Sequence, residues 1–264
     1  MDFVRINRSK IHQVILPIFK TTKKEPHDLI SFQGTGFIIA PKILVTCWHC
    51  IEEPLQENEQ YSAIVVKEDG TDHKLITLYN IDKDSNGNDL ATASHDYEPS
   101  EYLLKVPLND AAFGAEIWTY GYPFTAPELL PNRSIRFMVP PQFFKGYIVR
   151  NLIFKQPGYG DVKSYELDLN VPKGLSGAPV MGLGDTIVFG VIYGSNDIAT
   201  IDHLSLLDPE TGYKQPEIQR IVSLGVAHYT ENLLLVRGKA TDSVSLLDYC
   251  NRFVTKNDTK TGPN

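Results

Sequence analysis

The chain has 264 residues, of which 42% are hydrophobic and 22% charged, as is typical of a globular protein with one large domain or two small ones. Its formal net charge of −7 argues against binding to nucleic acid or to an anionic membrane by charge alone. No apolar run approaches the roughly 18 residues of a membrane-spanning helix, so we expect neither nucleic acid nor membrane as a partner.

The cysteines and the N-terminus indicate the compartment. Cys47, Cys50 and Cys250 are too few, and odd in number, for a disulfide framework. Residues 1–10 lack the apolar segment of a secretory signal. We therefore expect a cytoplasmic protein.

Short apolar or alternating stretches bounded by Gly, Pro and Asn recur along the chain and indicate β-strands. A polar segment at 21–27 predicts a hairpin loop, and the proline-rich segment 124–142 predicts the connection between two halves. Apolar residues at helical spacing between Val244 and Phe253 predict one amphipathic helix. The predicted strands lie within residues 11–19, 34–46, 61–81, 116–123, 145–155, 163–171, 186–195 and 221–228.

This pattern predicts an all-β protein of two packed barrels. We expect one domain over residues 1–237, with an N-terminal barrel at about 8–126 and a C-terminal barrel at about 143–230. Residues 238–264 are expected to form a linker, the amphipathic helix and a polar tail.

Three residues stand where strands end. His49 follows an apolar strand, Asp89 follows the polar turn 82–88, and Ser176 lies between glycines just after an alternating stretch. A serine nucleophile needs a base, an acid that orients the base, and N–H donors for the developing oxyanion. Taken singly, each could be a packing histidine, a turn aspartate or a loop serine. Their order, His then Asp then Ser, is that of the chymotrypsin-type triad.

The sequence around these residues resembles the trypsin/chymotrypsin-like serine peptidases, and the HtrA/Deg-type branch more than the secreted trypsins. The resemblance extends over roughly residues 11–236 and includes Gly121-Tyr122-Pro123 and Gly190-Val191-Ile192 as secondary matches. The three main blocks are Gly34-Thr35-Gly36-Phe37-Ile38-Ile39 with Thr46-Cys47-Trp48-His49, then Asp89-Leu90-Ala91, then Gly174-Leu175-Ser176-Gly177-Ala178-Pro179-Val180.

The resemblance implies a chymotrypsin-like fold of two six-stranded antiparallel barrels and a serine endopeptidase without cofactor or metal. Ser176 would be the nucleophile, His49 the general acid and base, and Asp89 the residue that orients His49. The backbone N–H groups of Gly174 and Ser176 would form the oxyanion hole. Protein or peptide would be the substrate. Asp96 and Asp110 are alternatives to Asp89.

One departure from the family concerns activation. Secreted trypsins carry an Asp immediately before the nucleophile, which pairs with a new N-terminus, whereas this chain has Leu175. We therefore expect no activation by N-terminal cleavage. The loop from Lys173 to Leu175 would be ordered by another contact, such as an activating protein partner. The alternative is a latent or inactive peptidase-fold module that binds proteins.

The resemblance also implies the substrate-binding residues. Asn170, six residues before the nucleophile, would form a neutral pocket floor, although nearby acidic residues leave a basic preference open. The strand of Ile192, Tyr193, Gly194 and Ser195 would pair with the substrate backbone. Tyr193 is equally compatible with packing.

The run from Cys47 to Cys50 has Cys-x-x-Cys spacing around His49, which also occurs in redox and zinc sites. A structural zinc site needs about four ligands, and the sequence has no second pair of cysteines. The family often bonds the cysteine after its histidine to an earlier cysteine near the Gly34 block, and that partner is missing here. We predict buried packing thiols and no metal site.

Overall fold

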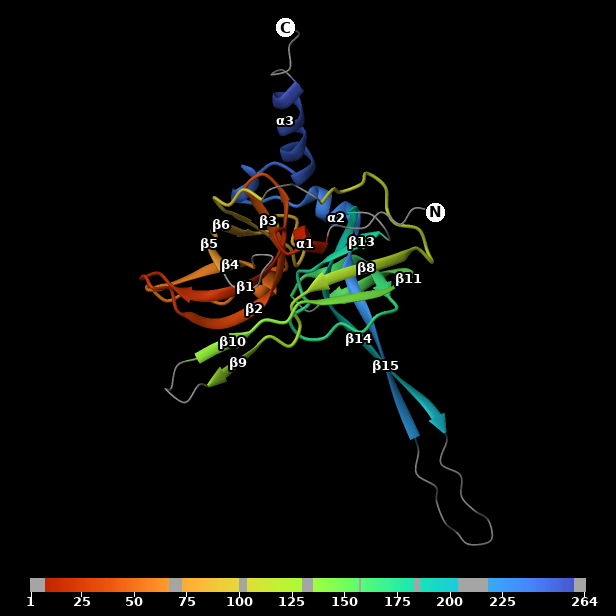
Figure 1. Cartoon of the computed structure of the whole chain (residues 1–264). Coiled ribbons are helices and arrows are strands. Elements are labelled where there is room, and N and C mark those ends of the chain that lie inside the picture. Colours follow the sequence, from red (N-terminus) through yellow and green to blue (C-terminus); the bar gives the residue numbers. More distant parts are fainter. Residues whose placement is uncertain are drawn as a thin grey trace, which may run out of the picture.

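The computed structural model describes residues 8–66, 73–99, 104–129, 135–156, 158–182, 186–203 and 218–258. Two curled antiparallel sheets lie side by side, and the helices after the second sheet lie at one end of the molecule (Figure 1). The predicted all-β double-barrel fold is confirmed. No helix in these ranges has the length and apolar character that crossing a membrane requires.

The first barrel has strand order β5-β4-β1-β2-β3-β7-β6. Only Leu78 separates β5 from β6, so these two strands form one bent strand that occupies both edges of the sheet and closes it. The barrel therefore has six strands when the bent one is counted once. They are β1 (Ile15–Thr22), β2 (Leu29–Ala40), β3 (Ile43–Thr46), β4 (Glu59–Val66), β5 (His73–Thr77), β6 (Tyr79–Lys83) and β7 (Ala91–Ser94).

The second barrel is closed, with order β11-β12-β15-β14-β13-β8. Within the predicted connection 124–142, β9 (Ala126–Leu129) and β10 (Ile135–Met138) form a separate hairpin. Phe137 of this hairpin contacts Phe19 of β1 edge to face, with ring centroids 5.3 Å apart. The barrel strands are β8 (Glu116–Gly121), β11 (Gln142–Gln156), β12 (Gly160–Leu167), β13 (Pro179–Gly182), β14 (Val188–His203) and β15 (Ile218–His228).

The two barrels share buried surface. Trp118, Met181 and Val191 of the second barrel belong to the same apolar cluster as the core of the first. The hydroxyl of buried Tyr122 donates a hydrogen bond to the carbonyl of Ile15 across the boundary, at 2.9 Å. Residues at this boundary are therefore held by both barrels, which suits a site that needs groups from each.

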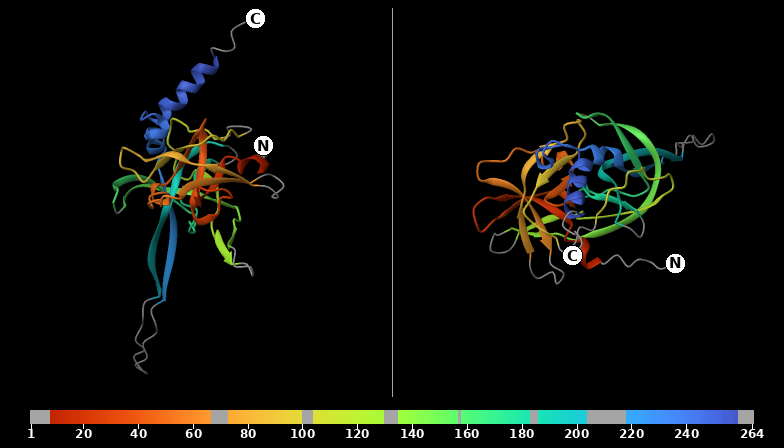
Figure 2. Two further views of the ribbon diagram at one scale, coloured as in Figure 1. Left: turned by 90° about the vertical axis from the view of Figure 1, so that its left-hand side faces the viewer. Right: turned by 90° about the horizontal axis from the view of Figure 1, so that it is seen from above.

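The C-terminal segment returns to the first barrel. The 3₁₀ turn η2 (Lys239–Thr241) packs against β6 and β7, and the hydroxyl of Tyr249 donates to the carbonyl of Pro41. The helix α3 (Leu246–Asp258) begins there and then extends away from the barrels (Figure 2). The remaining helical elements are α1 (Arg8–Ile11), η1 (Trp48–Cys50) and α2 (Thr230–Leu235). The predicted tail after residue 258 lies outside the described residues.

The buried carboxylate of Asp84 joins this segment to the turn that precedes Asp89. One oxygen accepts hydrogen bonds from the N–H groups of Asn86 and Arg237, and the other accepts one from the side-chain amide of Asn88 at 2.7 Å. The N–H of Asp84 itself donates to the carbonyl of Leu90. A single side chain therefore holds the turn and docks the C-terminal segment on it.

Replacing Asp84 with Ala should lower the free energy of unfolding by about 2 kcal/mol, because several hydrogen bonds to a buried carboxylate are lost. Chemical denaturation of the variant measures this. Asp161→Ala, which truncates an exposed carboxylate in β12, is the matched control and should stay close to wild type. Equal stability of the two variants would contradict this role of Asp84.

Candidate active site

Strand register brings His49 and Asp89 together. β3 and β7 are neighbours, and the last residue of β3, Thr46, pairs with the first residue of β7, Ala91. His49 follows β3 on η1, and Asp89 lies just before β7, separated from it by Leu90. Both residues therefore lie at the same end of this strand pair. The N–H of Trp48 donates to the carbonyl of Asp89 and fixes the turn there.

The side chains of these two residues form a close pair. His49 Nδ1 lies 2.6 Å from Asp89 Oδ2, and the backbone N–H of His49 donates to Asp89 Oδ1 at 3.0 Å. Asp89 is completely buried, whereas about a third of the His49 side chain is exposed. With Nδ1–H donating to the carboxylate, Nε2 of His49 is the nitrogen left to exchange a proton.

The pair changes the acidity of the imidazole. Burial lowers the pKa of His49, but the interactions with Asp89 and Cys50, above all the hydrogen bond to the Asp89 carboxylate, outweigh burial and raise the pKa to about 10. The site therefore stabilises the imidazolium form. A base of this kind holds a proton firmly once it has accepted one.

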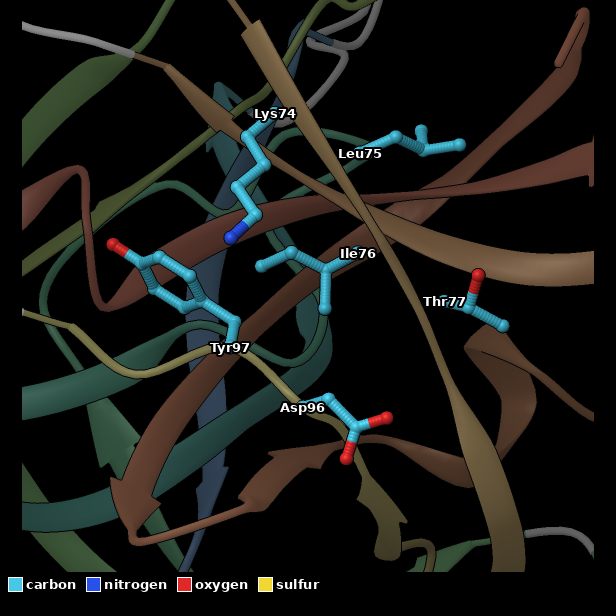
Figure 3. A pocket seen from close by; sticks show the side chains of 6 residues that line it. All are labelled: Lys74, Leu75, Ile76, Thr77, Asp96 and Tyr97. Carbon is cyan, nitrogen blue, oxygen red and sulfur yellow. The ribbon is translucent and has the colours of Figure 1, made fainter. Parts of the chain in front are cut away.

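The two alternative acids lie elsewhere. Asp96 accepts a hydrogen bond from the hydroxyl of Tyr79, and Asp110 lies 3.5 Å from the hydroxyl of Tyr165. Figure 3 shows Asp96 and Tyr97 beside a shallow pocket whose lining includes neither His49 nor Asp89. Of the three candidate carboxylates, Asp89 is the one that contacts His49.

The Ser176 turn is fastened to the first barrel by Thr35. The N–H of Thr35 donates to the carbonyl of Ser176, and its hydroxyl donates to the carbonyl of Gly174, each at 2.9 Å. The thiol of Cys50 also faces the Ser176 carbonyl, at 3.6 Å. Because Cys50 adjoins His49, these contacts place Ser176 beside the turn that carries the imidazole.

The loop before Ser176 leaves two N–H groups available. The carbonyl of Lys173 accepts a hydrogen bond from the N–H of Phe124, and a planar trans peptide then directs the N–H of Gly174 to the opposite side. Within the described part of the chain, the N–H groups of Gly174 and Ser176 bond to no protein acceptor. This is the arrangement that an oxyanion hole requires.

Gly174 cannot be replaced without strain. Its φ of +98° is unfavourable for residues with a side chain, and a Cβ there would lie 2.8 Å from the ring of Phe32. Leu175, the next residue, is fully buried in the core of the second barrel. Contacts within the chain therefore order the segment for which the sequence predicted an external contact.

The predicted substrate-binding residues divide into two groups. Ile192 and Tyr193 are buried, and the hydroxyl of Tyr193 is 2.6 Å from Ser164 Oγ. Gly194 is half-buried, while Ser195 and Asn170 are exposed.

Apolar side chains lie next to the predicted pocket floor. A Cβ added to Gly225 of β15 would lie 2.7 Å from Val171 and 3.2 Å from Leu169, so these two residues on either side of Asn170 are directed at β15. Their side chains are thus packed against the barrel, whereas Asn170 between them is exposed.

Three neighbouring side chains, those of Cys47, His49 and Asp89, carry atoms of the kind that bind metal ions. One ligand atom each of Cys47, His49 and Asp89 lies within 4.8 Å of the others. However, His49 and Asp89 are already joined by their hydrogen bond, and the Cys47 thiol donates to the carbonyl of Ile192. Burial, with the negative charge of Asp89, raises the pKa of Cys47 well above its ordinary value, whereas zinc binds thiolate. The arrangement fits a packing thiol better than a metal ligand.

Sequence reasoning missed three residues that support this site. Besides Thr35, the buried His228 of β15 donates from Nε2 to the carbonyl of Asp89 at 3.2 Å. Tyr159, in the turn between β11 and β12, has its pKa raised by burial, by the charges of Asp89 and Glu52 and by a hydrogen bond to Asp89. For Thr35, the flanking glycines were a local signal in the sequence. The contacts of His228 and Tyr159 with Asp89 join residues from opposite barrels, so no local sequence pattern indicates them.

Comparison with known proteins supports the architecture. The sequence matches no protein-family model and no curated protein sequence. Similar solved structures include the active form of the Rv3671c protease from M. tuberculosis, with 15% identity, a TM-score of 0.55, and 90% of this chain and 83% of that chain covered. The chain has the fold of the trypsin-like serine proteases.

Two further structures with this fold are similar. The MamO protease domain from Magnetospirillum magneticum in its apo form has 12% identity and a TM-score of 0.52, with 85% of this chain and 95% of that chain covered. The HtrA-type protease AlgW with a decapeptide has 13% identity and a TM-score of 0.53, with 88% of this chain and 65% of that chain covered. At these identities the likeness concerns the fold, and arguments about chemistry rest on the residues of this chain.

The histidine behind Asp89 makes the stability of the trypsin-like fold depend on pH. Burial lowers the pKa of His228 to about 4, so the folded state binds fewer protons than the unfolded state between about pH 6.5 and about pH 4. Stability must therefore fall as the pH falls through this range. The loss due to His228 should reach about 2 kcal/mol at about pH 5.

His228→Gln can keep the hydrogen bond to Asp89 but cannot titrate, so its stability should depend less on pH, as measured by chemical denaturation at several pH values. His95→Gln should act similarly, because burial also lowers the pKa of His95 to about 4. An acid dependence in His228→Gln identical to that of wild type would contradict this assignment.

Proposed function

We propose that the chain is a serine endopeptidase in which His49, Asp89 and Ser176 form the catalytic triad. The observation that carries the proposal is the 2.6 Å hydrogen bond between His49 and the buried Asp89, beside a serine turn fastened to the same barrel. The trypsin-like fold supports it, because this architecture places the two halves of such a site on two barrels.

The chemistry follows from these positions. In its neutral form, which becomes more abundant as the pH rises towards its raised pKa, His49 takes the proton from Ser176 Oγ at Nε2 while that oxygen attacks the carbonyl carbon of the scissile peptide bond. The negative charge that develops on the carbonyl oxygen is stabilised by the N–H groups of Gly174 and Ser176. The imidazolium then gives its proton to the leaving amine, and an acyl-enzyme remains on Ser176. Water, deprotonated by His49, hydrolyses that ester and regenerates the serine.

The substrate is proposed to be a protein or peptide in extended conformation. Its backbone would pair with β14 at Gly194 and Ser195, with Tyr193 and Ile192 forming the buried base of that strand. The residue before the scissile bond would lie near Asn170. Because Asn170 is neutral and supplies no fixed charge to pair with Arg or Lys, we expect an uncharged residue to be preferred there over a charged one.

Regulation and location stay predictions. Burial of Leu175 orders the oxyanion loop within the chain, which favours activity without cleavage of the N-terminus. An activating protein partner, the absence of a cofactor and a cytoplasmic location are carried forward from the sequence. Assays of the purified chain with and without candidate partners test the first of these.

Covalent labelling with a fluorophosphonate probe tests the proposal. Wild type should be labelled, Ser176→Ala should not, and Asp89→Asn should be labelled about 10³-fold more slowly because His49 loses the tautomer it needs. The matched control is Ser85→Ala, which removes an exposed hydroxyl in the turn between β6 and β7 and should be labelled like wild type.

Labelling that persists in Ser176→Ala would contradict the assignment of the nucleophile. Wild type that is not labelled, with or without candidate partners, would favour the alternative of an inactive peptidase-fold module that binds proteins.

A further inference from the structure

The second barrel carries a long β-ribbon that the proposed chemistry does not use. β14 has 16 residues and β15 has 11, and they pair from Val191↔His228 to His203↔Ile218. The ribbon leaves the barrel and projects from the body of the molecule, as both Figure 1 and Figure 2 show. We call the paired residues 196–203 and 218–224 the arm.

Both edges of the arm are unpaired among the described residues, and the edge on β14 is the one that continues from the proposed site. β13 pairs with β14 only as far as Val191. From Tyr193 onward, no strand among the described residues pairs with the side of β14 that faces away from β15. Such an edge presents a row of N–H and C=O groups and is a ready template for another extended chain.

The free edge begins at the proposed nucleophile. The N–H of Gly177 donates to the carbonyl of Ile192 at 2.7 Å, and the N–H of Ile192 donates to the carbonyl of Ala178 at 2.9 Å. The residues immediately after Ser176 therefore lie against β14 at the point where its edge becomes free. A peptide whose scissile carbonyl lies at Ser176 meets the start of this edge.

The base of the arm is rigidly attached to the barrel. The side-chain amide of Asn196 donates to Glu166 of β12 at 3.1 Å. Glu166 is only 1% exposed, and Arg150 of β11 donates to both of its carboxylate oxygens. Across the arm, Ser223 Oγ donates to Asp197. The first residues of the arm are thus held in line with the barrel strand, and the edge is preformed.

We propose that this edge binds the part of the substrate that precedes the scissile bond, beyond the residues paired with Gly194 and Ser195. The inference rests on the proposed peptidase function. Both strands that pair with β14 in the barrel, β13 and β15, run antiparallel to it. A peptide that also pairs antiparallel with the free edge of β14 runs from the arm towards Ser176. The N-terminal part of the peptide therefore lies along residues 196–203. If each of these residues pairs with one substrate residue, the edge binds about eight additional substrate residues.

Two deletion variants isolate the arm. In the first, Asn-Gly replaces residues 199–221 and joins Ile198 to Val222, which face each other across the ribbon. In the matched control, Asn-Gly replaces residues 204–217 and joins His203 to Ile218, also a facing pair. Both variants have the same new turn, but only the control keeps the whole paired arm.

The substrates are three peptides that share one cleavage sequence, chosen by profiling wild type on a proteome-derived peptide library. One is short, one is extended by about ten residues before the scissile bond, and one by about ten residues after it. Wild type and the control should cleave the N-terminally extended peptide with kcat/KM at least about tenfold above that of the short peptide. The arm deletion should lose this gain, and C-terminal extension should have little effect.

Fluorophosphonate labelling separates this inference from the proposed function. All three proteins should be labelled at the same rate, because the arm lies outside the catalytic residues. Normal labelling without an effect of N-terminal extension, or a gain that survives the arm deletion or requires C-terminal extension, overturns the arm proposal alone. Sedimentation showing that wild type is a dimer and the arm deletion a monomer assigns the edge to a second copy of the chain and also overturns it. Absence of labelling in wild type overturns both.

Discussion

The hydrogen bond between His49 and Asp89 is the interaction on which the site depends. A carboxylate without solvent contact is costly unless it is paired, and Asp89 is paired with both the imidazole and the backbone N–H of His49. This pairing depends on the register between β3 and β7. In that register Thr46 faces Ala91, which brings His49, shortly after Thr46, close to Asp89, shortly before Ala91. The first barrel therefore supplies both His49 and Asp89, the proposed base and its orienting acid, while His228 of the second barrel donates a hydrogen bond to the carbonyl of Asp89.

The serine half of the site is positioned by contacts that cross between the barrels. Thr35 of β2 binds the carbonyls of both Gly174 and Ser176, and Leu175 between them is buried in the second barrel's core. The Ser176 turn thus has one anchor in each barrel. The strand that accepts the N–H of Gly177 continues into the arm, so the proposed nucleophile lies next to the start of the free edge.

The sequence sufficed for most strands and for the double barrel, because alternating patterns and glycine turns are local features. It placed β8 within the N-terminal barrel at about 8–126, whereas β8 pairs with β11 and β13 of the second barrel, because strand pairing is not a local feature. It left Asp89, Asp96 and Asp110 as alternatives, since the choice depends on the register between β3 and β7. The roles of Thr35 and His228 were missed because each side chain binds a segment over a hundred residues away. The length of the arm was missed because β14 and β15 continue past the apolar stretches that mark a strand within a barrel.

An NMR titration of the His49 ring, with nitrogen-labelled histidine and the resonance assigned by mutation, measures the His49–Asp89 interaction directly. Because the Asp89 carboxylate favours the imidazolium, the pKa of His49 should lie well above the ordinary value of about 6.5, and Asp89→Asn should lower it. A wild-type His49 that titrates near about 6.5, and whose pKa does not change in Asp89→Asn, would contradict this interaction.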